Sequence, residues 1–173
     1  PAKEGKIPSL EIVKGLELLV TTAPSTQGRC MAGLLVAAVH NSCRGSDIQR
    51  TRNLQITDDT VTGESRFKGV KQWKRWAFPR SCFAHEWVEP WFETLHSCQL
   101  PGRDWILPGI NADMTEWSDR PAEHGDLNRA LKMLLMLHPI NLPSDLASEH
   151  TPHGLKHFGI TCGTQLDFPL AVM

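Results

Sequence analysis

The densest group of chemically active side chains lies in the last part of the chain. His150, His153 and His157 follow one another at spacings of three and four residues, and Lys156 stands between the last two. Histidines at helical spacing can bind zinc together, whereas a lysine among histidines can hold a phosphate group. A zinc site needs further ligands, and the nearest cysteine, Cys162, lies five residues beyond His157. The pattern by itself therefore argues against a metal site and leaves a phosphate-binding site open, and histidines that lie on the surface or cap helix ends explain it as well.

Two further groups of charged residues stand earlier in the chain. Arg44 follows a long apolar segment, and Asp47 comes three residues later, where we expect its carboxylate to hold the guanidinium in place. Taken alone, such a pair is usually a structural salt bridge. Segment 65–76 then interleaves basic residues with tryptophans: Lys68, Lys71, Trp73, Lys74, Arg75 and Trp76. Such a run suits contact with a nucleic-acid backbone, although a solvated protein face has the same composition.

The order of these groups resembles the active site of the tyrosine recombinase (phage integrase) family. That family has an Arg-x-x-Glu/Asp box after its second helix, which Arg44 and Asp47 match in this sequence. It then has a lysine on a β-hairpin, for which Lys68 is the best candidate and Lys71 the second. By this resemblance, the basic and tryptophan-rich segment belongs to the hairpin that approaches DNA.

A His-x-x-Arg box that opens a later helix completes the resemblance. His153 matches its histidine, and Lys156 stands where the family usually has arginine. His157 fits the common form His-x-Leu-Arg-His. The resemblance covers essentially the whole chain, because the order of helices and sheet also agrees. It implies catalytic roles for Arg44, Lys68, His153 and Lys156, and it requires neither a metal nor another cofactor.

The resemblance also implies a reaction and a partner. The parent protein would break and rejoin double-stranded DNA, in recombination or in the integration of mobile elements, as a homo-oligomer on paired DNA sites. A tyrosine hydroxyl attacks the phosphodiester, which gives a phosphotyrosine link and a free 5′ hydroxyl. Negative charge builds on the non-bridging phosphate oxygens, so fixed cations must meet it there. Arginine binds these oxygens, lysine protonates the leaving oxygen, and histidine assists proton transfer.

Two features of the chain depart from the family. Lys156 keeps the positive charge but lacks the planar fork of arginine, so it holds a phosphate less firmly. The 173 residues contain no tyrosine, and residues 157–173 are too few to reach the family's third box and its nucleophile. We therefore expect a single domain, residues 1–173, that is an incomplete recombinase-like catalytic domain. The alternative is a degenerate domain that only binds DNA or a protein partner.

Hydrophobic periodicity predicts the elements that must position these residues: a mainly α fold with a small antiparallel β-sheet. Helices are expected over residues 7–23, 27–43, 84–98 and 126–139, with a short turn or helix over 44–50. Strands are expected over residues 53–59, 61–68 and 74–80. We expect Asp126 to cap its helix, a short extended piece at 105–107, and a last helix that begins near His153.

Composition narrows the classes of function. The formal net charge is −1, so any DNA binding must come from local basic patches. No apolar run is long enough to span a bilayer. The five cysteines are scattered and form no Cys-x-x-Cys pair, which fits a reducing compartment. We therefore expect an intracellular protein that acts wherever its target DNA lies, without membrane contact.

Overall fold

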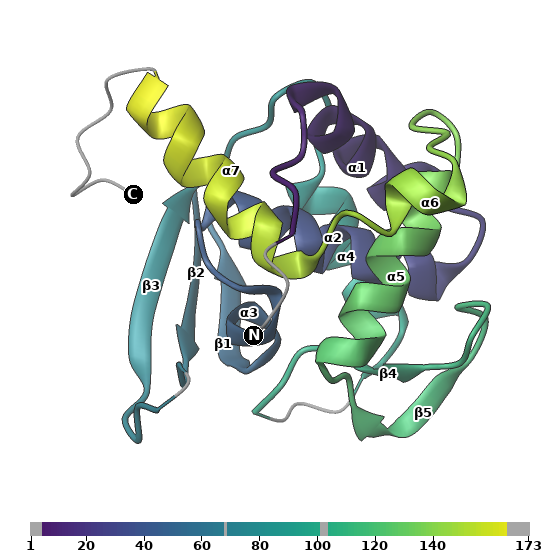
Figure 1. Cartoon of the computed structure of the whole chain (residues 1–173). Helices are drawn as coiled ribbons and strands as arrows, with labels where there is room; N and C mark the ends of the chain where they lie inside the picture. Colours follow the sequence, from purple (N-terminus) through teal and green to yellow (C-terminus); the bar gives the residue numbers. More distant parts are fainter. Residues whose placement is uncertain (1–4, 68, 101–103, 166–173) are drawn as a thin grey trace.

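The computed structural model describes residues 5–67, 69–100 and 104–165, and it is built mainly of helices (Figure 1). The helices are α1 (Leu10–Thr22), α2 (Thr26–His40), α3 (Gly45–Gln49), α4 (Val88–Ser97), α5 (His124–Met136), α6 (Ser144–Ala147) and α7 (Pro152–Gln165). All the predicted helices are present, and α6 is a short addition in a segment predicted as loop. The predicted fold class, mainly α with a small antiparallel sheet, is confirmed.

A three-stranded antiparallel sheet follows α3 in the sequence. Its strands are β1 (Thr51–Ile56), β2 (Thr60–Ser65) and β3 (Lys74–Pro79), hydrogen-bonded in the order β1-β2-β3. A tight turn joins β1 to β2, in which the Thr57 N–H donates to the Thr60 carbonyl at 2.9 Å. Residues 66–73 connect β2 to β3 at the end of the sheet far from α7 (Figure 1). The basic and tryptophan-rich segment is therefore a β-hairpin, as the sequence predicts.

Helix α2 is the centre of the core. Its residues 30–39 are all buried, as expected for a segment that is apolar on nearly every face. Helices α1, α4, α5 and α7 pack around it. Gly33 lets Trp91 of α4 approach closely, because a Cβ atom at this position would collide with the indole ring. The indole N–H of Trp91 donates to the Cys30 carbonyl at 3.0 Å, so the close contact is also fixed in orientation.

A buried carboxylate fixes the segment between β3 and α4. Glu17 of α1 is fully buried and accepts hydrogen bonds from the backbone N–H groups of residues 83–85, at 2.8 to 3.2 Å. The His40 ring lies 3.3 Å from the same carboxylate. Burial raises the pKa of Glu17, but these hydrogen bonds outweigh burial and hold the pKa below its ordinary value. The fixed segment places Phe83 edge-on against Phe158 of α7, with ring centroids 5.6 Å apart.

The region between α4 and α5 differs from the prediction. β4 (Pro108–Ile110) and β5 (Trp117–Pro121) form a second antiparallel hairpin, whereas residues 105–107, predicted as extended, are not a strand. The hairpin depends on a contact from outside its own sequence. The Gln49 side chain of α3 accepts the Leu107 N–H at 2.9 Å and donates to the Ala122 carbonyl at 3.3 Å. A local pattern does not contain this contact, which explains the wrong prediction.

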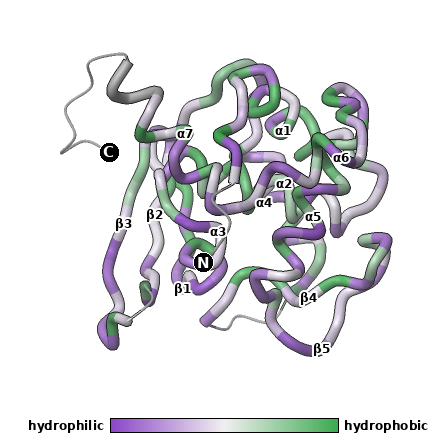
Figure 2. Tube along the Cα trace, viewed as in Figure 1, coloured by the Kyte–Doolittle hydropathy of each residue, from purple (hydrophilic) through white to green (hydrophobic). Residues whose placement is uncertain are grey.

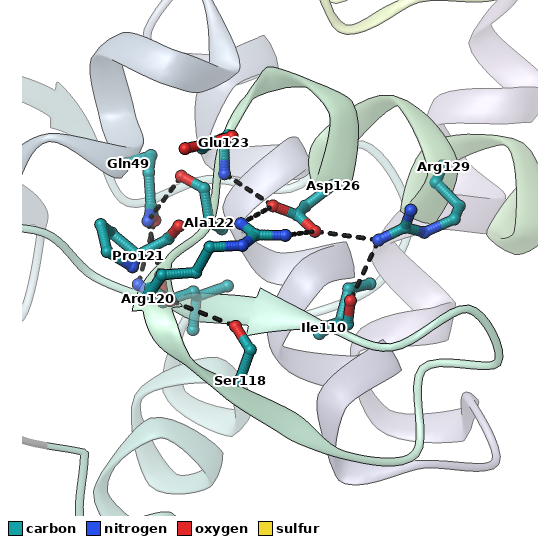
Figure 3. A network of polar contacts seen from close by, with 10 residues as sticks. Gln49, Ile110, Ser118, Arg120, Pro121, Ala122, Glu123, Asp126 and Arg129 are labelled. Atoms are coloured by element: carbon teal, nitrogen blue, oxygen red, sulfur yellow. Dashed lines mark hydrogen bonds and ion pairs between the residues drawn. The ribbon is translucent and has the colours of Figure 1, made fainter.

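The prediction that Asp126 caps α5 is wrong by one turn. Glu123 is the N-cap, and Asp126 lies within the first turn, where its carboxylate accepts the Glu123 N–H at 2.8 Å. The same buried carboxylate binds Arg120 at 2.6 Å and Arg129 at 2.9 Å (Figure 3). We call Arg120, Asp126 and Arg129 the Asp126 network. The predicted core face of the helix is confirmed, because all five residues are buried: Leu127, Ala130, Leu131, Leu134 and Leu135.

Hydropathy along the trace follows this architecture. Figure 2 shows apolar residues gathered on the helices around α2, while β5 and the outer part of β3 are mostly hydrophilic. Within residues 5–67, 69–100 and 104–165, no helix combines the length and apolar character needed to cross a bilayer.

Candidate functional site

Arg44 stands in the sharp connection between α2 and α3. Two residues after the end of α2, Ser42 has a positive φ of 49°, which turns the chain away from the helix axis. The buried Cys43 follows it. Arg44 is the N-cap residue of α3, and its carbonyl accepts the Asp47 N–H at 3.0 Å and the Ile48 N–H at 3.2 Å. Its backbone is thus held by the first turn of α3, and its half-buried side chain starts from a defined place on the surface.

The expected pairing of Arg44 with Asp47 is wrong. The Asp47 carboxylate lies 3.2 Å from the guanidinium of Arg50, one turn farther along α3. The physical reason is helix geometry: residues three apart inside a helix face the same side, whereas the N-cap residue lies outside the helical turn. Within the described part of the chain, the Arg44 guanidinium has no hydrogen bond or ion pair. It is therefore available to an anion from outside.

Helix α7 packs against the end of α2 and the start of α3 (Figure 1). Gly45 and Pro152 are neighbours across this contact, because a Cβ atom at Gly45 would lie 3.6 Å from the Cβ of Pro152, an ordinary packing distance. At Gly159 a Cβ atom would lie only 2.7 Å from the Val39 carbonyl oxygen, so a larger residue would force the helices apart. The first turns of α7, which carry the predicted His-x-x-Lys box, therefore lie beside the residue that follows Arg44.

The positive charge of Lys156 acts on Cys43, the residue that precedes Arg44. Burial, reinforced by the nearby Asp47 carboxylate, raises the pKa of the Cys43 thiol to about 12, and the Lys156 ammonium opposes this rise. Cys43 directly precedes Arg44, so Lys156 and Arg44 add their positive charges to one region of the fold. We use the name α3–α7 cluster for Arg44, at the start of α3, together with the two predicted site residues of the neighbouring α7, His153 and Lys156.

The three histidines of the opening pattern do not form one group. His150 is buried before α7 begins, and its ring Nδ1 lies 3.2 Å from the Leu146 carbonyl. His153 and His157 are partly exposed one turn apart on α7, with their Nε2 atoms 3.2 Å from each other. Among the residues the structure describes, no three His, Cys, Asp or Glu side chains gather as a metal site would require. The side chain of Cys162 lies outside that description.

The predicted hairpin lysine, Lys68, lies outside the described residues, so its position stays a prediction. Its second candidate, Lys71, is exposed in the β2–β3 connection. Trp73 lies in the same connection, with the guanidinium of Arg52 4.1 Å and that of Arg66 5.7 Å from its ring centre. Contacts of this kind are cation–π interactions, which order both the aromatic ring and the arginines. This end of the sheet is therefore basic and aromatic.

Sequence reasoning missed Arg52 and Arg66 as part of this surface. Arg52 is the second residue of β1, far from Trp73 in the chain, and its guanidinium also binds the Glu64 carboxylate at 3.1 Å. Arg66 directly follows β2, where its backbone N–H reaches the Arg50 carbonyl at 3.4 Å. The register of β1 on β2, which pairs Arg52 with Glu64, brings them together. The run of basic residues after position 65 was a signal for Arg66, but nothing in the local pattern pointed to Arg52.

Two solved structures match the chain over almost its whole length. A pre-cleavage complex of the XerH site-specific recombinase with its difH substrate aligns with a TM-score of 0.65 and 11% identity, covering 96% of this chain and 46% of that chain. A post-cleavage complex of the same recombinase with a palindromic difH substrate aligns with a TM-score of 0.61 and 12% identity, covering 98% and 45%. No protein-family model and no curated protein sequence matches the chain.

These identities are low, so the likeness concerns the fold. The chain spans about half the length of the recombinase chains that it matches. The helices, the small sheet and their order are those that the sequence resemblance implied. This chain has the tyrosine recombinase fold.

Proposed function

We propose that this chain is a recombinase-like domain that binds double-stranded DNA and holds a backbone phosphate with the α3–α7 cluster. One observation carries the proposal: α7 packs against the start of α3, so that Arg44, without a carboxylate partner in the described residues, shares a region with Lys156. The two aligned structures are complexes of a site-specific recombinase with its difH substrate, before and after cleavage, which supports a substrate of the kind that a site-specific recombinase cleaves.

Each member of the cluster has a distinct role in this proposal. The Arg44 guanidinium donates two parallel hydrogen bonds to the non-bridging phosphate oxygens. Lys156 adds a point charge to the same oxygens but lacks a second parallel donor. His153 exchanges a proton with the phosphate or positions it. Lys68, or Lys71 in its place, protonates the leaving oxygen in this proposal, which requires the β2–β3 connection to move toward α7 when DNA binds, because it lies at the far end of the sheet. The proposal needs no metal and no other cofactor.

The basic end of the sheet supplies a second contact to DNA. Arg66 and Lys71 lie on the connection that carries the proposed hairpin lysine, and Trp73 with Arg52 orders it. Phosphate contacts of this kind hold a protein in register on the duplex without reading its sequence. The hairpin therefore contributes affinity and orientation.

In the parent protein, we propose, DNA strands are broken and rejoined through a phosphotyrosine intermediate. The 173 residues contain no tyrosine, so the nucleophile has to come from sequence outside them or from another chain. The working form is a homo-oligomer on paired DNA sites, inside the cell where the target DNA lies. Energy from a nucleotide is not required, because the phosphotyrosine link conserves the phosphodiester bond energy.

A second candidate function is DNA or protein binding without cleavage. One observation favours it: Lys156 occupies the position where the family usually has arginine. Loss of the planar fork weakens transition-state stabilisation more than it weakens ground-state binding. A domain with this cluster would keep DNA affinity after losing the reaction.

The first experiment measures DNA binding by fluorescence anisotropy over a range of salt concentrations. Arg44→Ala should weaken binding about tenfold and lower the salt dependence by about 0.9 logarithmic units per lost phosphate contact. The matched control is Lys14→Ala, which removes the same charge from α1, where the Lys14 ammonium pairs with Glu11 at 3.1 Å. Equal losses in the two variants would show that only total charge matters and would contradict the proposed site.

The second experiment separates cleavage from binding. The coding sequence is read in frame past residue 173, and the extended chain is incubated with nicked duplex DNA. For a recombinase, we expect a tyrosine downstream and a protein–DNA adduct that resists detergent. The adduct should be absent in Arg44→Ala. DNA binding without an adduct would leave the second candidate as the function.

A further inference from the structure

The two partly exposed histidines of α7 hold one ring nitrogen each close to the other. The Nε2 atoms of His153 and His157 are 3.2 Å apart, and their ring planes are inclined by 71°. Two imidazole nitrogens bound to one tetrahedral zinc ion, each at about 2.05 Å, are about 3.3 Å apart. The helix therefore already holds two ligand atoms at the separation that a metal ion requires.

We propose that His153 and His157 form a binding site for a divalent late transition metal ion such as Zn²⁺ or Ni²⁺. Without metal, one ring donates its Nε2–H to the Nε2 lone pair of the other. In the metal-bound form both Nε2 lone pairs bind the ion, and the donor ring carries its proton on Nδ1 instead. No proton is lost in this exchange, because only the tautomer changes.

The site has open coordination positions. No third His, Cys, Asp or Glu of the described residues joins the pair, and His150 is held apart by the Leu146 carbonyl. A zinc ion with two protein ligands completes its shell with water or with an oxygen of a bound anion. Structural zinc sites, in contrast, are closed by four protein ligands. We therefore expect reversible binding that is not needed for folding.

Metal binding has a consequence for the α3–α7 cluster. A metal ion on the Nε2 atom of His153 occupies the lone pair that proton exchange with a phosphate would use, so the loaded site inhibits that step. This consequence rests on the proposed function. The metal site itself does not, because it follows from the two imidazoles alone.

The test is calorimetric titration of the 173-residue chain with NiCl₂ or ZnCl₂, in the absence of DNA. We expect one ion per chain, and we expect His157→Ala and His153→Gln each to weaken binding more than about tenfold, because each removes one of the two protein ligands. The matched control is His124→Ala, an exposed histidine in the first turn of α5, which should leave binding unchanged. Absence of binding, or equal losses in all three variants, would overturn the proposal.

Two further readouts keep the test independent of folding and of the proposed function. Imidazole NMR signals of His153 and His157 should shift together on zinc addition, and shifts confined to other histidines would also overturn the site. Lys156→Met should weaken DNA binding in the presence of a chelator but leave metal binding intact. Intact metal binding without any effect of the cluster variants on DNA affinity would refute the proposed function and leave the metal site standing.

Discussion

Two regions of this molecule contain arginines, and they differ in whether the arginine is paired with a carboxylate. In the Asp126 network, two guanidiniums share one buried carboxylate, and Arg129 also donates to the Ile110 carbonyl at 3.0 Å (Figure 3). In the α3–α7 cluster, the carboxylate nearest in sequence is taken by Arg50, and Arg44 has no partner among the described residues. The first arrangement joins a hairpin to a helix, and the second leaves a positive charge for an external anion.

The difference teaches how to separate a structural arginine from a functional one. A charge that is matched by a carboxylate and by backbone carbonyls contributes to stability, because its removal leaves a buried partner unsatisfied. An unmatched charge contributes little to folding and can meet an anion from outside, which is the role that we propose for Arg44. Sequence motifs do not make this distinction, because Arg-x-x-Asp occurs in the sequence at Arg44 while Asp47 pairs with Arg50.

The largest expected effect is on folding, at Asp126. Asp126→Asn removes the charge that two arginines and the start of α5 share, and it should lower the free energy of unfolding by about 2–4 kcal/mol. Chemical denaturation measures the change. The control, Asp119→Asn, alters an exposed aspartate of β5 and should shift the midpoint little. A comparable loss in the control would mean that the network has no special role.

The same carboxylate makes stability depend on pH. Burial raises the pKa of Asp126, but hydrogen bonds from Arg120 and Glu123 outweigh burial and hold the pKa below its ordinary value of 3.8. A pKa that is lower in the folded state gives stability that is present above the unfolded value and is lost as the pH falls through the folded one. Glu17, whose pKa is also lowered, adds to this loss below its ordinary value of 4.5.

We therefore expect the free energy of unfolding to fall steeply below about pH 4. Thermal unfolding measured at a series of pH values tests this. Asp126→Asn should make the acid slope shallower, since the substituted side chain does not titrate. An unchanged slope in the variant would show that other carboxylates dominate acid unfolding.

A reciprocal pair of variants tests the comparison directly. Arg44→Ala should weaken DNA binding by about 1.4 kcal/mol, which is tenfold, and change the free energy of unfolding by less than about 0.5 kcal/mol. Arg120→Ala should do the reverse and destabilise the fold by about 1 kcal/mol with little effect on DNA. Fluorescence anisotropy gives the change in DNA affinity of each variant, and chemical denaturation gives the change in its free energy of unfolding. If Arg44→Ala mainly destabilised the fold, the distinction between the two regions would be lost.

The smallest expected effect is at Lys156. Lys156→Arg restores the planar fork and should strengthen DNA binding by less than about 1 kcal/mol, with an unchanged salt dependence because the charge is the same. Lys14→Arg is the matched control on α1. Weaker binding by Lys156→Arg would indicate that the site accommodates the slim lysine side chain and excludes the guanidinium.

Most helices could be predicted from the sequence, because their signals are local. The Ser9 cap and the apolar repeat of α1, the continuous apolar run of α2 and the stop before Pro139 are contained in the segments themselves. The β4–β5 hairpin could not be predicted, because Gln49 of α3 holds it in place through side-chain hydrogen bonds. The capping role at α5 was ambiguous, because Glu123 and Asp126 are both acceptable caps until their hydrogen bonds are known.

By itself, the sequence determined which residue types are available: a basic and tryptophan-rich hairpin, a His-x-x-Lys box at the start of a helix, and no tyrosine. The tertiary structure decided which of them meet and which charges stay unmatched. Close approach at Gly159 brings α7 to the end of α2, Pro152 packs beside Gly45 at the start of α3, and the α3 backbone turns Asp47 toward Arg50. The physical reason is that pairing depends on distance in space, and helix packing sets that distance between residues more than a hundred positions apart.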